Sequence, residues 1–252
     1  MPTPSEIRLV VMTVNRTPAY VHSTLASLLA SDPLVRGLPG VDLVVGSPDD
    51  GYLDCYRHHR WVRVHPLDPA EWARVRDWPT GRKFCHNYHR CLTTPLAGAR
   101  GLCVCEDDVV VRDGFVSKLL AVVEEMERGH GLSEYLLACY VPYRLADQPD
   151  LRRGRLFASY HPPTFFGTQC MYYPRPVLGA LQARVLRDGV ERHTQPGDWV
   201  VRDYGAEING IYGTVASLAQ HVGRQTTGLG KFHTAPTFDQ PFPDLAGPGS
   251  AA

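Results

Sequence analysis

The stretch LCVCEDDVVV, residues 102–111, decides both the fold class and the candidate site of this chain. An apolar strand leads directly into three consecutive carboxylates, Glu106, Asp107 and Asp108, and a second apolar run follows them. Adjacent carboxylates repel one another, so burying all three without a cation is costly. A hard divalent cation such as Mg²⁺ or Mn²⁺ removes that cost, because carboxylate oxygens are its preferred ligands. We therefore favour a metal site over a solvated acidic turn, with Asp108 as the direct metal ligand.

Strands and helices alternate on both sides of this stretch. Nearly continuous apolar segments predict strands at residues 7–14, 41–46, 61–65, 102–105 and 135–141. Apolar residues at helical spacing predict helices at residues 19–30, 81–92 and 115–128. This alternation predicts an α/β fold with a mostly parallel central sheet flanked by helices. In such sheets ligands collect at the carboxyl ends of the strands, which is where the three acids lie.

The second half of the chain has a different character, with frequent proline, glycine and aromatic residues. Residues 159–173 are rich in tyrosine and phenylalanine and predict strands that shape a pocket. Residues 176–186 predict a helix. Prolines recur towards the end of the chain, and we expect residues 239–252 to form a flexible tail.

Charge and hydropathy narrow the possible partners. The 252 residues include 26 basic and 26 acidic side chains, for a formal net charge of zero, which argues against nucleic acid or an acidic membrane as a partner. No apolar run approaches the roughly 20 residues that a membrane-spanning helix needs. The first residues lack the basic and apolar segments of a signal peptide. We therefore expect a cytoplasmic protein without a membrane span.

Seven cysteines give an odd number, and none of them forms a Cys-x-x-Cys pair. Cys103 and Cys105 point to the same face of one strand, which is unfavourable for a bridge. Cys85 and Cys91 have two histidines between them and could bind zinc, but a second half with the right spacing is missing. We expect buried free thiols.

A second metal ligand is expected from the end of another strand. His221 follows the apolar run of residues 215–219 and precedes Gly223, so it is placed where a strand ends. The alternative is an ordinary core or surface histidine, and the two interpretations carry equal weight.

The helix at residues 81–92 groups cationic and amide side chains on one flank, among them Arg82 and Asn87. Guanidinium and amide groups suit phosphate and ribose oxygens. A solvated helix face is the alternative. Further along, Gln169 follows Gly167 and Thr168, where small residues permit close approach of a ligand and Gln169 could bind a sugar hydroxyl; a plain turn is the alternative there.

Asp198 is the candidate general base. It follows Pro196 and Gly197 and precedes a helical stretch, so it could be held rigidly at the mouth of the site or simply cap the helix. Asp203 is its rival for the role of base. The chain contains no dinucleotide fingerprint, Walker loop, nucleophile elbow or zinc-protease motif, which argues against the common nucleotide-hydrolysing, esterase and zinc-protease classes.

Taken in order, these pieces resemble a nucleotide-sugar glycosyltransferase of the GT-A fold. The likeness lies in Thr13–Arg16, Ser47–Asp50, Arg82–Asn87, Glu106–Asp108, Gly167–Gln169, Asp198 and Gln220–Gly223. Within that fold, the sequences 106–109 and 198–230 look most like the N-acetylglucosaminyltransferase IV family and its bacterial relatives.

The resemblance implies a single GT-A-like domain over residues 1–238. Residues 1–140 would bind the nucleotide sugar, and residues 141–238 would form a smaller acceptor-side region. The implied reaction moves a sugar from a nucleotide-diphosphate donor, such as a UDP-sugar and in particular UDP-N-acetylglucosamine, to the hydroxyl of a carbohydrate or other acceptor.

The resemblance also implies roles for individual residues. Asp108 and His221 would hold Mn²⁺ or Mg²⁺ at the donor diphosphate, and Glu106 and Asp107 would contact the ribose or the donor sugar. Asp198 would deprotonate the acceptor hydroxyl for an inverting, in-line attack. The nucleotide pocket would be lined by Asn15, Arg16, Asp49 and Arg82, with support from Asn87.

Two other functions fit the sequence less well. A sugar nucleotidyltransferase would need a glycine-rich phosphate loop after the first strand, and residues 13–18 contain no glycine. A carbohydrate- or nucleotide-binding protein without catalysis would stack sugars on its aromatic residues and leave the acids idle.

Overall fold

The computed structural model describes residues 7–37, 40–142, 155–165, 167–224 and 232–243. Its centre is a sheet whose strand order is β3-β2-β1-β4-β8-β6-β9-β7. The strands are β1 (Ile7–Thr13), β2 (Val41–Val45), β3 (Val62–His65), β4 (Gly101–Glu106), β6 (Leu136–Ala138), β7 (Phe157–Ser159), β8 (Cys170–Pro174) and β9 (Ile211–Thr214). The strands β3, β2, β1 and β4 run parallel, as do β6 and β9. The antiparallel β8 lies between β4 and β6, and β7 is antiparallel to β9.

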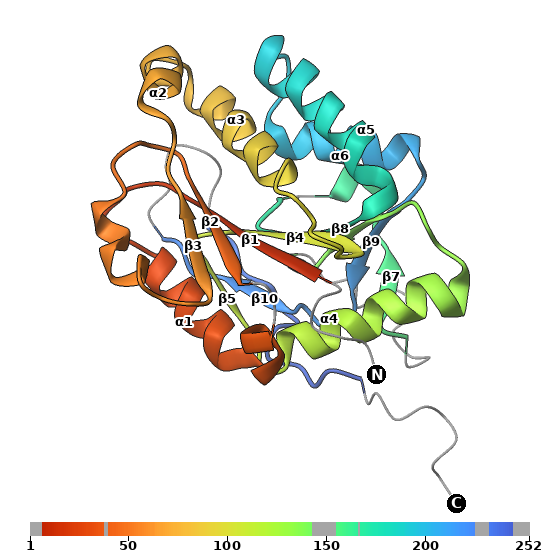
Figure 1. Ribbon diagram of the computed structural model, residues 1–252. Helices are drawn as coiled ribbons and strands as arrows, with labels where there is room; N and C mark the ends of the chain where they lie inside the picture. Colours follow the sequence, from red (N-terminus) through yellow and green to blue (C-terminus); the bar gives the residue numbers. More distant parts are fainter. Residues whose placement is uncertain (1–6, 38–39, 143–154, 166, 225–231, 244–252) are drawn as a thin grey trace, which may run out of the picture.

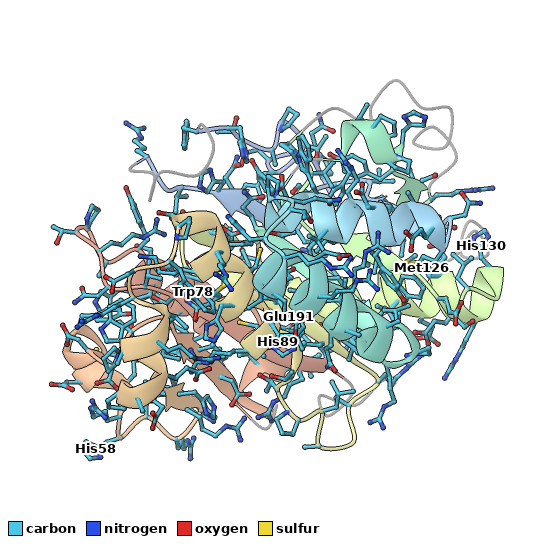
Figure 2. The ribbon with its side chains drawn as sticks, turned by 90° about the horizontal axis from the view of Figure 1, so that it is seen from above. His58, Trp78, His89, Met126, His130 and Glu191 are labelled. Atoms are coloured by element: carbon cyan, nitrogen blue, oxygen red, sulfur yellow. The ribbon has the colours of Figure 1, made fainter. Side chains whose placement is uncertain are left out.

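Helices cover both faces of this sheet (Figure 1). On one side lie α2 (Pro69–Val75), α3 (Thr80–Leu92), α5 (Arg175–Arg184) and α6 (Gly197–Glu207). On the other side lie α1 (Val21–Ser31) and α4 (Phe115–Glu124). Short segments of π-helix extend α4 over Glu125–Gly129 and α5 over Val185–Glu191. Figure 2 looks down on the first group of helices. In this group α3 packs against the π-helix Val185–Glu191, and the labels of His89 and Glu191 show the two elements.

The two faces of the sheet bury two separate apolar clusters. Side chains alternate across a strand, so Leu9 and Val11 of β1 face α1 and α4 while Val10 and Met12 face α3. Strands buried on both faces read as continuous apolar runs, which is why the sequence predicted them well. The fold class predicted from the alternation is confirmed: the sheet is mixed, mostly parallel and flanked by helices.

A short antiparallel ribbon pairs the strand that follows the acid triplet with a strand late in the chain. It pairs β5 (Val109–Val111) with β10 (Ala219–His221), and His221 lies opposite Val109. The ribbon therefore carries His221 to the residues that follow β4, although the two are more than a hundred positions apart in the sequence.

One local prediction was right only in part. Residues 159–173 were expected to form strands, and β8 does cover Cys170–Pro174, but β7 ends at Ser159 and the described residues between the two are not in a strand. A turn of 3-10 helix at Pro162–Thr164 lies between them, because two successive prolines lack the N–H groups that a strand ladder needs. Residues 244–252 of the expected tail lie outside the described residues. Within the described chain, none of the helices has the length and apolar character required to cross a membrane.

Candidate active site

The carboxyl ends of the parallel strands open into one cavity of about 880 Å³. This volume lies near the upper end of the roughly 300–1,000 Å³ that small-molecule sites occupy. Residues 13–16, 46–49 and 106–108 line it from the ends of β1, β2 and β4, and we call them the strand-end region. Residues 167–169, 196–199 and 232–233 also line it, and we call them the helix-start region because α6 begins among them.

Ten of the eleven residues singled out from the sequence line this cavity. They are Asn15, Arg16, Asp49, Asn87, Glu106, Asp107, Asp108, Gln169, Asp198 and His221. The eleventh, Arg82, does not line it. Its Nε donates to the carbonyl oxygen of Val190 at 2.7 Å, and its guanidinium lies over the ring of Trp78 at 3.8 Å. Arg82 is therefore engaged in packing α3 against the segment after α5.

The first two acids of the triplet have raised pKa values. Asp107 is buried, accepts a hydrogen bond of 2.7 Å from Thr13 Oγ1 and is bound by the Arg16 guanidinium. Burial raises the pKa of Asp107 to about 6, although Arg16 opposes the shift. Burial, followed by the charges of Asp108 and Asp107, raises the pKa of Glu106 to about 8. Thr168 Oγ1 donates to Glu106 at 3.2 Å. The mutual repulsion of these carboxylates is what a bound cation would relieve.

Asp108 differs from its two neighbours. Burial alone would raise its pKa, but the hydrogen bond and charge of His221, together with Arg16, outweigh burial and lower it. Both partners reach the same oxygen: Arg16 at 3.0 Å and His221 Nε2 at 3.3 Å from Oδ2. The other oxygen, Oδ1, is buried and makes no hydrogen bond within the described residues. Asp108 is therefore ionised and has one oxygen without a partner there.

His221 is oriented by its backbone neighbour. Its Nδ1 lies 3.2 Å from the carbonyl oxygen of His233, so Nδ1 carries the proton in that bond. Nε2 then faces Asp108 Oδ2, and metal-binding histidines likewise bond a carbonyl oxygen through one ring nitrogen and use the other as the ligand. Gly223 keeps this space open, because a Cβ atom there would lie 2.4 Å from Asp108 Oδ2.

Asn15 and Asn87 lie in or beside the strand-end region. Asn15 Nδ2 donates to Asp49 Oδ2 at 3.0 Å. Asn87 packs so closely under the turn after β2 that a Cβ on Gly46 would lie 2.1 Å from its Nδ2. These side chains present amide and carboxylate groups to the cavity, which suits a polar, hydrogen-bonding ligand.

Asp198 is the second residue of α6, and Pro196 occupies the cap position. The interpretation of Asp198 as the helix cap was therefore wrong. Burial raises the pKa of Asp198, although nearby backbone N–H groups and Arg202 oppose the shift. Its rival Asp203 does not line the cavity and pairs with Arg202 at 2.8 Å. Of these two aspartates of α6, Asp198 is thus the one that lines the cavity.

Gln169 is held in the cavity wall by the turn before it. Gly167 has a φ of +83°, which suits glycine, and a Cβ there would lie 1.9 Å from Gln169 Oε1. That oxygen is buried and makes no hydrogen bond within the described part of the chain. The backbone carbonyl of Gln169 accepts from the N–H of Glu106 at 2.8 Å, which fixes the turn against the acid triplet.

Several lining residues were not found by sequence reasoning. Two are aromatic: Trp199 and Phe232 are each 49% exposed, and both line the helix-start region. Thr13 and Thr168, which bond Asp107 and Glu106, were also missed. Trp199 stands next to Asp198 and could have been found by that adjacency. Phe232 gives no such signal, because it belongs to no predicted helix or strand.

Comparison with known proteins identifies the fold. No protein-family model matches the chain, and no curated protein matches it. Among solved structures, S. aureus TarS 1–349 is 13% identical with a TM-score of 0.53, and the match covers 83% of this chain and 58% of that one. The same fragment in complex with UDP-GlcNAc is 14% identical with a TM-score of 0.50, covering 83% and 56%. An active-site mutant of LgtC is 11% identical with a TM-score of 0.50, covering 79% and 70%.

These neighbours are glycosyltransferases of the GT-A fold, so the chain has the fold of that class. At such low identity the likeness extends to the fold alone. The activity has to be argued from the cavity and its residues.

Proposed function

We propose that this protein is a metal-dependent glycosyltransferase that moves a sugar from a nucleotide-diphosphate donor to an acceptor hydroxyl. One observation carries the proposal. A GT-A fold brings three acids, a histidine and a separate carboxylate on α6 to one cavity, in which Asp107 and Asp108 are buried. We also propose that residues 1–238 act as one domain, since strands from both halves of the chain form the central sheet.

The donor set fits a hard divalent cation, Mn²⁺ or Mg²⁺. Asp108 and His221 would hold it, since Asp108 Oδ1 has no described partner and His221 directs Nε2 towards the same carboxylate. When bound, such a cation offsets negative charge on a diphosphate leaving group. Arg16 pairs with Asp107 and with Oδ2 of Asp108, which leaves Oδ1 of Asp108 for the cation.

The remaining strand-end residues bind the nucleotide in this proposal. Asn15, Asp49 and Asn87 would offer hydrogen bonds to base and ribose, Arg16 would contact the nucleotide, and Glu106 and Asp107 would contact the ribose or the donor sugar. A UDP-sugar is the expected donor, with UDP-N-acetylglucosamine first, because the TarS fragment was solved with UDP-GlcNAc and the sequence resembles the N-acetylglucosaminyltransferase IV family. Arg82 is left out of the nucleotide pocket, because its guanidinium is held by Val190 and Trp78.

Asp198 acts as general base in this proposal. A base works best when its pKa approaches the operating pH, and burial moves the pKa of Asp198 in that direction. The carboxylate takes the proton of the acceptor hydroxyl as the oxygen attacks the anomeric carbon, and the nucleoside diphosphate leaves from the opposite side. This in-line geometry gives inversion.

The acceptor side is aromatic. Trp199 follows the proposed base directly and is half exposed beside the cavity, as is Phe232. Exposed aromatic rings stack on the apolar faces of sugar rings, so we propose a carbohydrate acceptor.

Thermal stability against a panel of nucleotide sugars, each with and without Mn²⁺, tests the donor site. A ligand at 100 times its dissociation constant adds about 2.7 kcal/mol, a rise of several degrees in Tm for a domain of this size. We expect one UDP-sugar to raise the Tm only with Mn²⁺, and Asp108→Ala to abolish the rise. If no donor shifts the Tm, the transferase proposal fails.

A further inference from the structure

Four of the seven cysteines meet inside the core, directly behind the acid triplet. Cys103 and Cys105 lie two positions apart on β4 and so point to the same face of the sheet. Cys170 begins β8 and is paired in register with Cys105. Cys139 follows β6, and its N–H donates to the carbonyl oxygen of Cys170 at 2.9 Å. Because β4, β8 and β6 are neighbours in the sheet, the four side chains converge from three adjacent strands.

The sulfur atoms are close to the spacing that a metal ion imposes. Those of Cys103, Cys105 and Cys170 all lie within 4.8 Å of one another, and the Cys105–Cys170 distance is 3.4 Å. A tetrahedral zinc site with Zn–S bonds of about 2.3 Å separates its sulfurs by about 3.8 Å. All four cysteines are free thiols. Small rotations of the side chains would bring three sulfurs to ligand distance.

The rest of this face of the sheet is filled differently. On β1 and β2 the equivalent side chains are Leu9, Val11, Leu43 and Val45, and all are fully buried. A single buried cysteine is an ordinary small apolar residue. Four thiols gathered at one point, where the adjoining strands use leucine and valine, indicate a local role for sulfur.

We propose that Cys103, Cys105, Cys139 and Cys170 bind one thiophilic metal ion, with zinc as the first candidate. Thiolates prefer such ions over Mg²⁺ and Mn²⁺, so this site and the carboxylate site would bind different metals. All four cysteines are buried, which leaves no access for substrate or water and gives the ion a structural role. Each cysteine that binds the ion loses its proton, so a buried Zn²⁺ with three or four thiolates carries a net charge of −1 or −2.

The ion would tie together the strands that carry the proposed active site. Cys105 directly precedes Glu106, and Cys170 directly follows Gln169. The N–H of Glu106 already donates to the carbonyl oxygen of Gln169. A metal behind these residues would hold β4 against β8 at that point. The inference does not depend on the proposed transferase activity.

Metal content of the full-length protein tests the inference. The protein is expressed in zinc-supplemented medium, purified without chelator or histidine tag, and measured by inductively coupled plasma mass spectrometry. We expect about one zinc per chain, and at least a tenfold loss in the double variant Cys103→Ala/Cys170→Ala. The matched control is Cys85→Ala/Cys91→Ala, which removes two buried thiols outside the cluster and should keep the metal.

A second measurement covers the case in which the cluster variant does not fold. Because the site is sealed, the unfolded wild-type chain is refolded with Co²⁺, and thiolate-to-cobalt charge-transfer absorption is expected. Absence of metal from the wild-type protein together with absence of that absorption overturns the proposal. So does retention of metal in the cluster variant, loss of metal in the control variant, or a mass two units lower that shows paired thiols.

Discussion

The strand-end region and the helix-start region form two walls of one cavity but are built on different principles. In the strand-end region two buried carboxylates, Asp107 and Asp108, are paired with Arg16. In the helix-start region Asp198 has a raised pKa, and two aromatic rings are half exposed. The charged side chains of the strand-end region are therefore preorganised. The helix-start region leaves apolar surface exposed, and monomeric proteins keep such surface mainly for partners or ligands.

The comparison predicts that the two walls can be disabled separately. Asp198→Asn removes the proposed base with little change in shape, so turnover should fall by about 10²–10⁴-fold, the usual contribution of a general base. Donor binding should persist, because the strand-end region is intact. Initial rates and the Mn²⁺-dependent thermal shift measure the two effects.

Asp203→Asn is the matched control, since Asp203 lies on the same helix but does not line the cavity. It should leave turnover within about twofold of wild type, as surface changes usually do. Equal losses in the two variants would assign the base elsewhere. Unchanged turnover in Asp198→Asn would do the same.

Gly223→Ala should break the strand-end region without removing a functional group. The new Cβ would lie 2.4 Å from Asp108 Oδ2 and displace that carboxylate. We expect Mn²⁺-dependent donor affinity to fall by about 10–100-fold, the range found when the support of a metal ligand is lost. Isothermal titration with donor and Mn²⁺ measures it.

Gly179→Ala provides the control for this change. A Cβ at Gly179 meets nothing within 4 Å, and the residue lies within α5, so alanine should stabilise the helix by up to about 1 kcal/mol. Donor affinity should not change in that variant. Wild-type affinity in Gly223→Ala would show that Asp108 does not need the space beside Gly223.

Trp199→Ala tests the aromatic wall. The acceptor KM should rise about tenfold, equivalent to about 1.4 kcal/mol of binding, while the donor KM stays constant. Methyl glycosides serve as acceptors in initial-rate measurements, and Trp199→Phe should restore most of the loss. Leu186→Ala is the control, because Leu186 is also exposed but does not line the cavity. An unchanged acceptor KM in Trp199→Ala would exclude stacking on this ring.

The two walls also differ in how far the sequence predicts them. The strand-end region follows from parallel strands, whose carboxyl ends meet at one edge of a sheet, so Glu106, Asp107, Asp108 and Asn15 could be placed together from their positions alone. His221 was placed at a strand end correctly. Its pairing opposite Val109, however, depends on the ribbon that β10 forms with β5, and no local sequence pattern predicts that ribbon.

The helix-start region depends on contacts that local periodicity does not encode, and Phe232, for example, belongs to no regular element. The same limit explains the wrong prediction for Arg82. This residue was expected in the nucleotide pocket, but its guanidinium is held by Val190 and Trp78. The thiol cluster was missed for a related reason. Periodicity places Cys103 and Cys105 on one face, but Cys139 and Cys170 join them only through strand order, since β8 is inserted antiparallel between β4 and β6.

The pH dependence of turnover sharpens the comparison further. The base must be ionised to accept a proton, so kcat/KM should fall tenfold per pH unit below the pKa of Asp198. Burial raises that pKa above the ordinary value of 3.8, so the acid limb should lie at higher pH than an exposed aspartate would give. A pH–rate profile of the wild type and Asp203→Asn should show the same limb, since Asp203 is turned towards Arg202. A limb at or below the ordinary value would mean that Asp198 is solvated during the reaction, and burial would then not tune the pKa of the proposed base.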